Sequence, residues 1–438
     1  MGSPVDNRNV QEIALNNPII LTQILKQSST LLKTARLVCP FWNDVVLSVP
    51  NTELIFNLRH PDKLIESDAV PFFEICSTLD ERVAKRISAA FPESPFAAIF
   101  SAKVMHSCDK FSGIIQILEV FIQHETCFAS VYHVLRRSCQ NLRQLKVSCT
   151  FAKQNLMPIE EQKGMLKVRP NLTKFSLSSN LVTAFLAKFI EAVINTAPNL
   201  RDLTLPWGYY PNFSNSSKSL QSLTIAQDSI KPIDMVSALV ALPNIARILD
   251  KVSESLVTLS FRNVENSEIM IRDGMEGIYN FERFLPTGFL LAGGKMMKKL
   301  KNLRIEMVDI FRSVDLLRNI GEMLPALETV AIGRVYKRSK CAEEILRNIC
   351  NQGKTLISVK HLELIEVHDP TLLDGLKTVF PNLERLKVSG HALERGREWD
   401  EVGRGSAGMC GLGNFETFEF GGAHVSGRNF GNFTNSLA

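Results

Sequence analysis

The chain has 438 residues, of which 45% are hydrophobic and 22% are charged, with a formal net charge of +5. This composition is that of a folded globular protein and excludes a disordered or fibrous chain. The charge is spread along the sequence and not gathered into a basic stripe, so we expect no nucleic-acid partner.

Residues 1–15 are mostly polar and are predicted to form a flexible N-terminus. They hold no apolar stretch behind a basic start, so we expect no secretory signal. No later window reaches the roughly twenty apolar residues of a membrane helix, and we expect no membrane partner. The cysteines are scattered without metal-ligand spacing, which indicates reduced thiols, no metal site and no cofactor. We therefore predict a cytoplasmic protein, with the nucleus as an alternative.

Residues 16–46 read NNPIILTQILKQSSTLLKTARLVCPFWNDVV and predict a compact group of short helices. Pro18 suits the first turn of a helix because its φ is already helical. The apolar residues after it recur three and four apart, and the pattern resumes after the cap-favouring QSST. A module spanning 16–50 is too small to bury all these side chains by itself, so its surplus apolar surface requires a partner.

This stretch resembles an F-box, whose pattern is a Pro-led helix, a loop, and an ARLVC-type helix with a Trp three residues beyond the Cys. Cys39 and Trp42 stand in that register, while Asn17 replaces the common Leu before the Pro. F-boxes dock on the Skp adaptor of cullin–RING ubiquitin ligases. The resemblance carries this docking onto Pro18, Leu21, Ile24, Leu25, Leu31, Leu32, Leu37, Val38 and Trp42.

A second interpretation remains open for the same stretch. The helices could form the N-terminal cap of the repeat array that follows, with the same apolar residues facing inward.

Residues 51–141 are predicted to hold irregular early repeats and a helical connector. The segments TELIFNL at 52–58 and FAAIFSAKV at 96–104 suggest strands. Apolar spacing near 72–90 and 114–138 suggests helices.

Residues 142–422 contain a repeat. Ten segments carry apolar residues at the first, fourth and sixth of six places, and the last three places alternate as in a half-buried strand. Helical patterns lie between them, as at 181–197, 314–324 and 342–350. The ten segments are LRQLKV at 142, LTKFSL at 172, LRDLTL at 200, LQSLTI at 220, LVTLSF at 256, LKNLRI at 300, LETVAI at 327, VKHLEL at 359, LERLKV at 383 and FETFEF at 415.

These units resemble leucine-rich repeats, which implies an α/β solenoid with parallel strands on a concave face and helices outside. Each unit buries its apolar faces only against its neighbours. The polar fifth places project from the strand face and are the candidate substrate-binding residues: Lys146, Ser176, Thr204, Thr224, Ser260, Arg304, Glu363, Lys387 and Glu419.

No pattern in the chain indicates catalysis. The sequence GRGSAG at 403–408 matches a phosphate-binding spacing, but neither a strand before it nor a helix after it is predicted. Residues 423–438 are predicted to be a loose C-terminal tail. The two resemblances together predict a non-catalytic substrate-recognition subunit of a Skp–cullin–F-box ubiquitin ligase, with an unknown protein substrate. The alternative is a leucine-rich-repeat interaction scaffold without a ligase role.

Overall fold

The computed structural model divides the chain into two compact units, Met1–Phe175 (unit 1) and Ser176–Ala438 (unit 2). The predicted tail at 423–438 and residues 1–11 of the predicted flexible N-terminus lie outside the described residues, while residues 12–15 are helical. The structure describes residues 12–27, 32–48, 55–59, 69–91, 97–124, 127–151, 166–181, 183–213, 218–227, 235–263, 295–306, 320–333, 341–351, 353, 355–365, 375–389 and 417–421.

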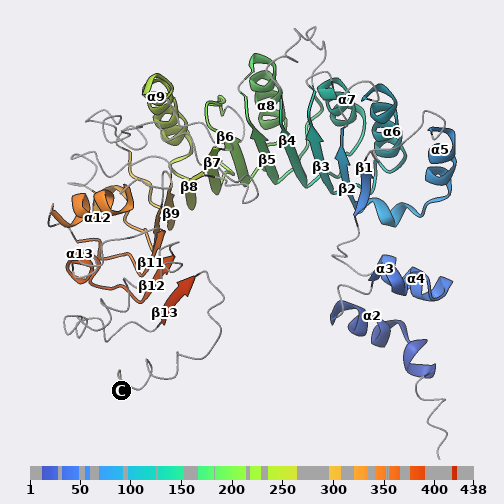
Figure 1. Cartoon of the computed structure of the whole chain (residues 1–438), viewed down its shortest axis with the longest axis horizontal. Helices are drawn as coiled ribbons and strands as arrows, with labels where there is room; N and C mark the ends of the chain where they lie inside the picture. Colours follow the sequence, from blue (N-terminus) through green and yellow to red (C-terminus); the bar gives the residue numbers. More distant parts are fainter. Residues whose placement is uncertain are drawn as a thin grey trace, which may run out of the picture. The chain divides into compact units, whose positions relative to one another are not determined.

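Unit 1 begins with short helices and continues with strands and helices in alternation (Figure 1). Its elements are α2 (Pro18–Gln27), α3 (Leu32–Ala35), α4 (Pro40–Ser48), β1 (Phe56–Arg59), α5 (Ala69–Thr78), the 3-10 helix η3 (Glu81–Lys85), β2 (Arg86–Ala90), α6 (Ala97–Lys110), β3 (Ile117–Ile122), α7 (Phe128–Arg137) and β4 (Gln144–Cys149). The strand β5 (Lys174–Ser179) contains the boundary between the units.

Unit 2 continues the alternation of strands and helices. Its elements are α8 (Ala184–Thr196), β6 (Asp202–Pro206), β7 (Ser222–Gln227), α9 (Met235–Val252), β8 (Thr258–Asn263), β9 (Asn302–Ile305), α11 (Ile320–Met323), β10 (Thr329–Ile332), α12 (Cys341–Asn351), β11 (His361–Ile365), α13 (Leu376–Val379), β12 (Arg385–Ser389) and β13 (Thr417–Gly421).

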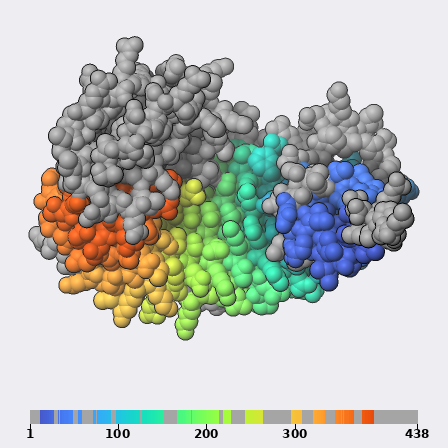
Figure 2. All heavy atoms as spheres, turned by 90° about the horizontal axis from the view of Figure 1, so that it is seen from below, coloured from blue at the N-terminus to red at the C-terminus, as the bar shows by residue number. Residues whose placement is uncertain are grey.

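Strands that follow each other in the sequence pair in parallel within each unit. In unit 1 this holds from β1 to β4, and in unit 2 from β6 to β13. In Figure 1 the helices α6 and α7 lie along one side of the strands of unit 1. Figure 2 shows the residues of unit 2 succeeding one another from green to orange in chain order. The predicted α/β class with parallel strands is confirmed.

The ten repeat segments are all strands, as predicted. In each of them the strand begins at the third place of the six-residue pattern, so the strand starts at the same point of every repeat. The fourth-place residues then stand side by side, as Leu203 beside Leu223 and Leu223 beside Leu259. All three are buried, so the apolar places form a continuous core under the strands.

The backbone repeats as regularly as the side chains. The first-place N–H of Leu327 donates to the carbonyl of Leu324 at 3.2 Å, closing a turn that also leads into β4, β5, β6, β9, β11 and β12. The second-place carbonyl of Lys301 accepts hydrogen bonds from two N–H groups of the next repeat, those of Glu328 (2.9 Å) and Thr329 (2.8 Å). Because this pattern recurs from strand to strand, each strand fixes the register of the one after it.

The predicted helices of the repeat region agree with the structure where it describes them. The patterns at 181–197 and 342–350 correspond to α8 and α12, and residues 320–323 of the pattern at 314–324 form α11. The Thr183 side chain caps α8 by accepting a hydrogen bond from the N–H of Leu186 at 3.2 Å. Among the described residues, every helix is too short or too polar to cross a membrane.

Of the predictions for residues 51–141, one was wrong and three were confirmed in part, including the strand at 52–58, where β1 covers residues 56–58. The segment at 96–104 lies in the helix α6, because Phe100 and Val104 recur four residues apart and are both buried. The ranges 72–90 and 114–138 are only partly helical, since they contain the strands β2 and β3. The region is therefore made of strand–helix units like those that follow it.

A buried arginine ties one repeat of unit 1 to the next. Arg169 is only 4% exposed, and its guanidinium donates hydrogen bonds to the carbonyls of Leu135, Ser138 (3.0 Å) and Cys139 at the end of α7. Leu135 lies in the last turn of α7, and Ser138 and Cys139 follow the helix, where backbone carbonyls lack the usual helical partner. The Cys139 carbonyl also accepts a hydrogen bond from the N–H of Leu142 at 3.2 Å. Burial lowers the pKa of Arg169.

Replacing Arg169 by Met should destabilise the protein by about 2–4 kcal/mol, because three buried carbonyls lose a donor while the volume is largely kept. Urea-induced unfolding followed by circular dichroism measures the change. Arg143→Met is the matched control, since this exposed side chain precedes the neighbouring strand and its loss should cost less than about 0.5 kcal/mol. Equal stability of the two variants would contradict the role given to Arg169.

Candidate functional site

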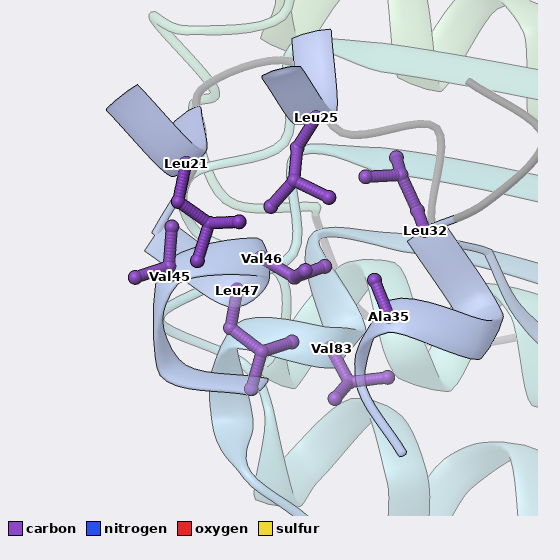
Figure 3. Packing of buried hydrophobic residues seen from close by; sticks show 8 residues of the cluster. All are labelled: Leu21, Leu25, Leu32, Ala35, Val45, Val46, Leu47 and Val83. Atoms are coloured by element: carbon purple, nitrogen blue, oxygen red, sulfur yellow. The ribbon is translucent and has the colours of Figure 1, made fainter. Parts of the chain in front are cut away.

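The helices α2, α3 and α4, called the N-terminal helical module below, enclose a small apolar core. Figure 3 shows side chains from all three helices pointing toward one another and toward Val83 of η3. Phe41 and Trp42 are partly buried against this cluster. The core consists of Leu21, Leu25, Leu32, Ala35, Val45, Val46, Leu47 and Val83.

The start of α2 follows from two adjacent residues. Pro18 occupies the first helical position, as predicted. Asn17 caps the helix, since its Oδ1 accepts hydrogen bonds from the N–H groups of Ile19 (2.9 Å) and Ile20 (3.3 Å). The Asn that replaces the common Leu of the F-box pattern therefore has a structural role of its own.

The predicted adaptor-binding residues do not all reach the surface. Leu21, Leu25 and Leu32 are at most 8% exposed and belong to the core of the module, so they have no free surface to offer a partner. Trp42 supports the same core from its edge. Leu31 lies outside the described residues. Replacing Leu21 by a polar residue would disrupt this core, so such a variant cannot separate lost binding from lost folding.

The remaining predicted residues are exposed and unusually apolar. Leu37 is 84%, Val38 58% and Ile24 44% exposed, and Pro18 is also at the surface. Ile20 and Ile24 lie four residues apart on α2, beside the buried Leu21 and Leu25, and both are exposed. A 10-residue helix that buries two leucines and exposes the isoleucines beside them has more apolar surface than its own core uses.

Polar contacts join the module to the first repeats. The guanidinium of Arg82 in η3 forms ion pairs with Asp44 (2.8 Å) and Asp80 (2.7 Å) and donates to Ser48 Oγ at 3.0 Å. The hydrogen bond from Arg82 lowers the pKa of Asp80. Together with Val83, these contacts fix the end of α4 against the residues that lead into β2.

The second candidate surface is the polar face of the strands, formed by the third, fifth and seventh places of each repeat. The predicted fifth-place residues fall there in consecutive register, so that Thr204 lies beside Thr224 and Lys387 lies beside the Cα of Glu419. Lys146 is exposed in unit 1, and Ser176, Thr204 and Thr224 are half-buried. The side chain of Glu419 lies outside the described residues.

Ser260 departs from the prediction of a solvent-facing residue. It is 5% exposed, although it stands at the same place as the half-buried Thr224 of the neighbouring strand. Its strand neighbour on the other side is Arg304, a much longer residue than the threonines of β6 and β7.

Arg304, Glu306, Glu363 and Lys387 form a connected group, called the charge network below. Arg304 Nη1 lies 3.0 Å from Glu363 Oε2, and Lys387 Nζ lies 3.0 Å from Glu363 Oε1. Arg304 also pairs with Glu306, whose side chain is only 9% exposed. The four residues therefore hold one another in place and are not independent contact points.

Small residues on β10 make this network possible. The register places Ala331 between Arg304 of β9 and Glu363 of β11, so the long arginine can reach over it. Just beyond the strand, a Cβ on Gly333 would come within 3.0 Å of Glu306 Cγ and 3.1 Å of Ile365 Cδ1. The side chains of two strands thus close over the strand between them.

Sequence reasoning missed part of this surface. Glu306 is a seventh-place residue outside the six-residue pattern, and Glu119 with Arg86 forms a pair at 3.0 Å on strands that were not predicted. The signal for β3 was present, because IQILEV at 115–120 carries apolar residues at the first, fourth and sixth places. The corresponding AKRISA at 84–89 is weaker, since two of its three apolar residues are alanines.

A scan against models of protein families and a search of curated proteins give no match for this chain. Among the described residues, no three histidine, cysteine or carboxylate side chains are grouped so that they could hold a metal ion. The functional argument therefore rests on the two surfaces described above.

Gly333→Ala should destabilise the protein by about 1–3 kcal/mol, because Glu306 and Ile365 must move to admit the methyl group. Thermal or urea unfolding checks this. Gly321→Ala in α11 is the matched control, since nothing lies within 4 Å of the added Cβ and alanine favours the helix. If both substitutions leave the stability unchanged or raised, the tight packing over β10 is disproved.

The charge network should make stability depend on pH in the acid range. Burial alone would raise the pKa of Glu363, but the hydrogen bond from Lys387 and the charges of Arg304 and Lys387 bring it below the ordinary value of 4.5. The folded state then binds fewer protons than the unfolded state, so this stabilisation is complete above about pH 4.5 and is lost as the pH falls through the folded pKa.

Glu363→Gln should accordingly flatten the loss of stability between about pH 5 and pH 3 relative to the wild type. Urea unfolding at several pH values gives the slope. Exposed Glu322 on α11 supplies the control, since Glu322→Gln should leave the slope as it is. A Glu363→Gln slope equal to that of the wild type would mean that the ion pairs do not stabilise the fold.

Proposed function

We propose that the chain is a non-catalytic substrate-recognition subunit of a Skp–cullin–F-box ubiquitin ligase. Its N-terminal helical module resembles an F-box and binds the Skp adaptor, which links it to a cullin–RING ligase. Its strand–helix units resemble leucine-rich repeats and bind a protein substrate through the polar strand face. Such a subunit raises the concentration of its substrate near the ubiquitin-carrying enzyme. The compartment we propose is the cytoplasm, with the nucleus as an alternative.

One observation carries the adaptor half of this proposal. Ile24, Leu37 and Val38 are predicted docking residues, and all three expose apolar surface that the core of the module does not use. Exposed aliphatic side chains of this kind are typical of a surface that a partner covers. The docking set is thereby narrowed to these three with Pro18, while Leu21, Leu25 and Leu32 support them from inside.

The fixed contact between the module and the repeats favours a second function. Val83 completes the core of the module, and Arg82 pairs with Asp44, so the helices also serve as an N-terminal cap. A cap of this kind suits a leucine-rich-repeat scaffold without a ligase role. The two functions differ in the role of the exposed residues. A docking surface needs Leu37 and Val38 exposed, whereas a cap does not.

Leu37→Asp should weaken the complex with a purified Skp adaptor by at least about tenfold, because a charge replaces an apolar side chain in the contact. Binding is measured by pull-down or calorimetry, with circular dichroism to show that the fold is kept. Val168→Asp is the matched control, since Val168 is also exposed (69%) and lies in the same unit away from the module. Absence of adaptor binding by the wild type would favour the scaffold, whereas undiminished binding by Leu37→Asp would show that Leu37 is not part of the docking surface.

A further inference from the structure

The polar face over β6, β7 and β8 carries mostly short hydroxyl side chains, together with the half-buried Asp202 on β6 and Arg262 on β8. Within the described residues, Ser260 Oγ is buried and has no hydrogen-bond partner. A buried hydroxyl without a partner costs free energy that the fold does not recover by itself. The hydroxyl residues at the third and fifth places are Thr204, Ser222, Thr224, Thr258 and Ser260.

Two arginines are neighbours of this serine on the strand face. Arg304 is its register neighbour on β9, with its guanidinium paired to Glu306 and Glu363, and Arg262 follows two residues later on the same face and is exposed. A serine O–H and two guanidinium groups are all donors, so together they suit an acceptor that carries negative charge.

Over β8 to β12 the cationic side chains are more exposed than the carboxylates. The carboxylates lie deep, with side-chain exposures of 9% for Glu306 and 22% for Glu363, whereas Arg304 and Lys387 keep 30% and 39%. Arg262 and Arg385 are exposed. A partner that approaches β8 to β12 therefore meets cations first and the carboxylates only beneath them.

We propose that this face binds an acidic segment of a protein, with one carboxylate accepting a hydrogen bond from Ser260 Oγ between Arg262 and Arg304. Both arginines have several rotatable bonds, so the carboxylate displaces side chains and not the backbone. Glu306, which is buried, and Glu363, which is half-buried, disfavour a dense polyanion such as nucleic acid, which would place phosphates over both of them. This inference rests on the proposed function, since it gives the chemistry of the substrate that the strand face receives.

The spacing of the cations sets the spacing of the acidic residues. From Ser260 on β8 to Lys387 on β12 there are four strand intervals, which is about 19 Å at about 4.8 Å each. An extended peptide covers this distance in about six residues at about 3.4 Å per residue. Two glutamates six positions apart can thus contact Ser260 with its arginines and Lys387 at the same time.

The test uses the full chain and a fluorescein-labelled peptide with two glutamates separated by five glycines. Fluorescence anisotropy at about 50 mM salt should show saturable binding, and a twin with glutamines should bind at least about tenfold more weakly. Ser260→Ala should also reduce the affinity for the glutamate peptide about tenfold, although it changes no charge. The melting temperature of the Ser260→Ala protein should be unchanged or higher, because the Ser260 hydroxyl makes no hydrogen bond in the folded protein. Thr378→Ala removes an exposed hydroxyl from the helix α13, outside the strand face, and should bind as the wild type does.

Arg262→Gln provides a second variant at an exposed position, and we expect a comparable loss of affinity. Wild-type affinity in both Ser260→Ala and Arg262→Gln would overturn the proposal, as would the failure of the wild type to prefer glutamate over glutamine. Adaptor binding measured on the same protein separates the two conclusions. A chain that binds the adaptor but not the acidic peptide keeps the ligase role and loses this site, and the reverse result leaves an acidic-segment scaffold.

Discussion

The parallel register of consecutive strands is the constraint on which the rest of the structure depends. Each second-place carbonyl accepts two N–H groups from the next strand, so a strand cannot slip without breaking both bonds. A slip by one residue would also turn the buried leucines to the polar face. With the register fixed, equivalent places of successive repeats become neighbours, although they are 20 or more residues apart in the sequence.

The same register explains why the polar face is not a uniform row of side chains. Short residues at Ala331 and Gly333 let the side chains of β9 and β11 meet across β10, and the charge network forms there. On β6 and β7 the fifth places are threonines, which cannot reach past a neighbouring strand. One part of the face therefore carries ion pairs between its own strands, and the other carries short hydroxyl side chains.

The sequence was sufficient to predict the strands from 142 onward, because one apolar pattern recurs with Leu, Val, Ile or Phe at its fixed places. It was less informative before residue 142, where Ala84 and Ala89 weaken the pattern of β2 and where the α6 segment is apolar enough to suggest a strand. The polar face could be predicted as a set of places but not as a network. The Arg304–Glu363 contact depends on the size of a third residue, Ala331, on the strand between them.

In the N-terminal helical module, too, the sequence pattern predicts the apolar residues but not how they pack. Helical spacing identifies which residues are apolar, but it does not decide which of them the module uses for its own core. With only three short helices, the core takes Leu21, Leu25 and Leu32 and adds Val83 from η3 to complete itself. Leu37 and Val38 fall in the turn before α4, where no helix of the module can cover them. Their exposure is therefore a consequence of where α3 ends, and it leaves apolar area at the one end of the array where no further repeat precedes the module among the described residues.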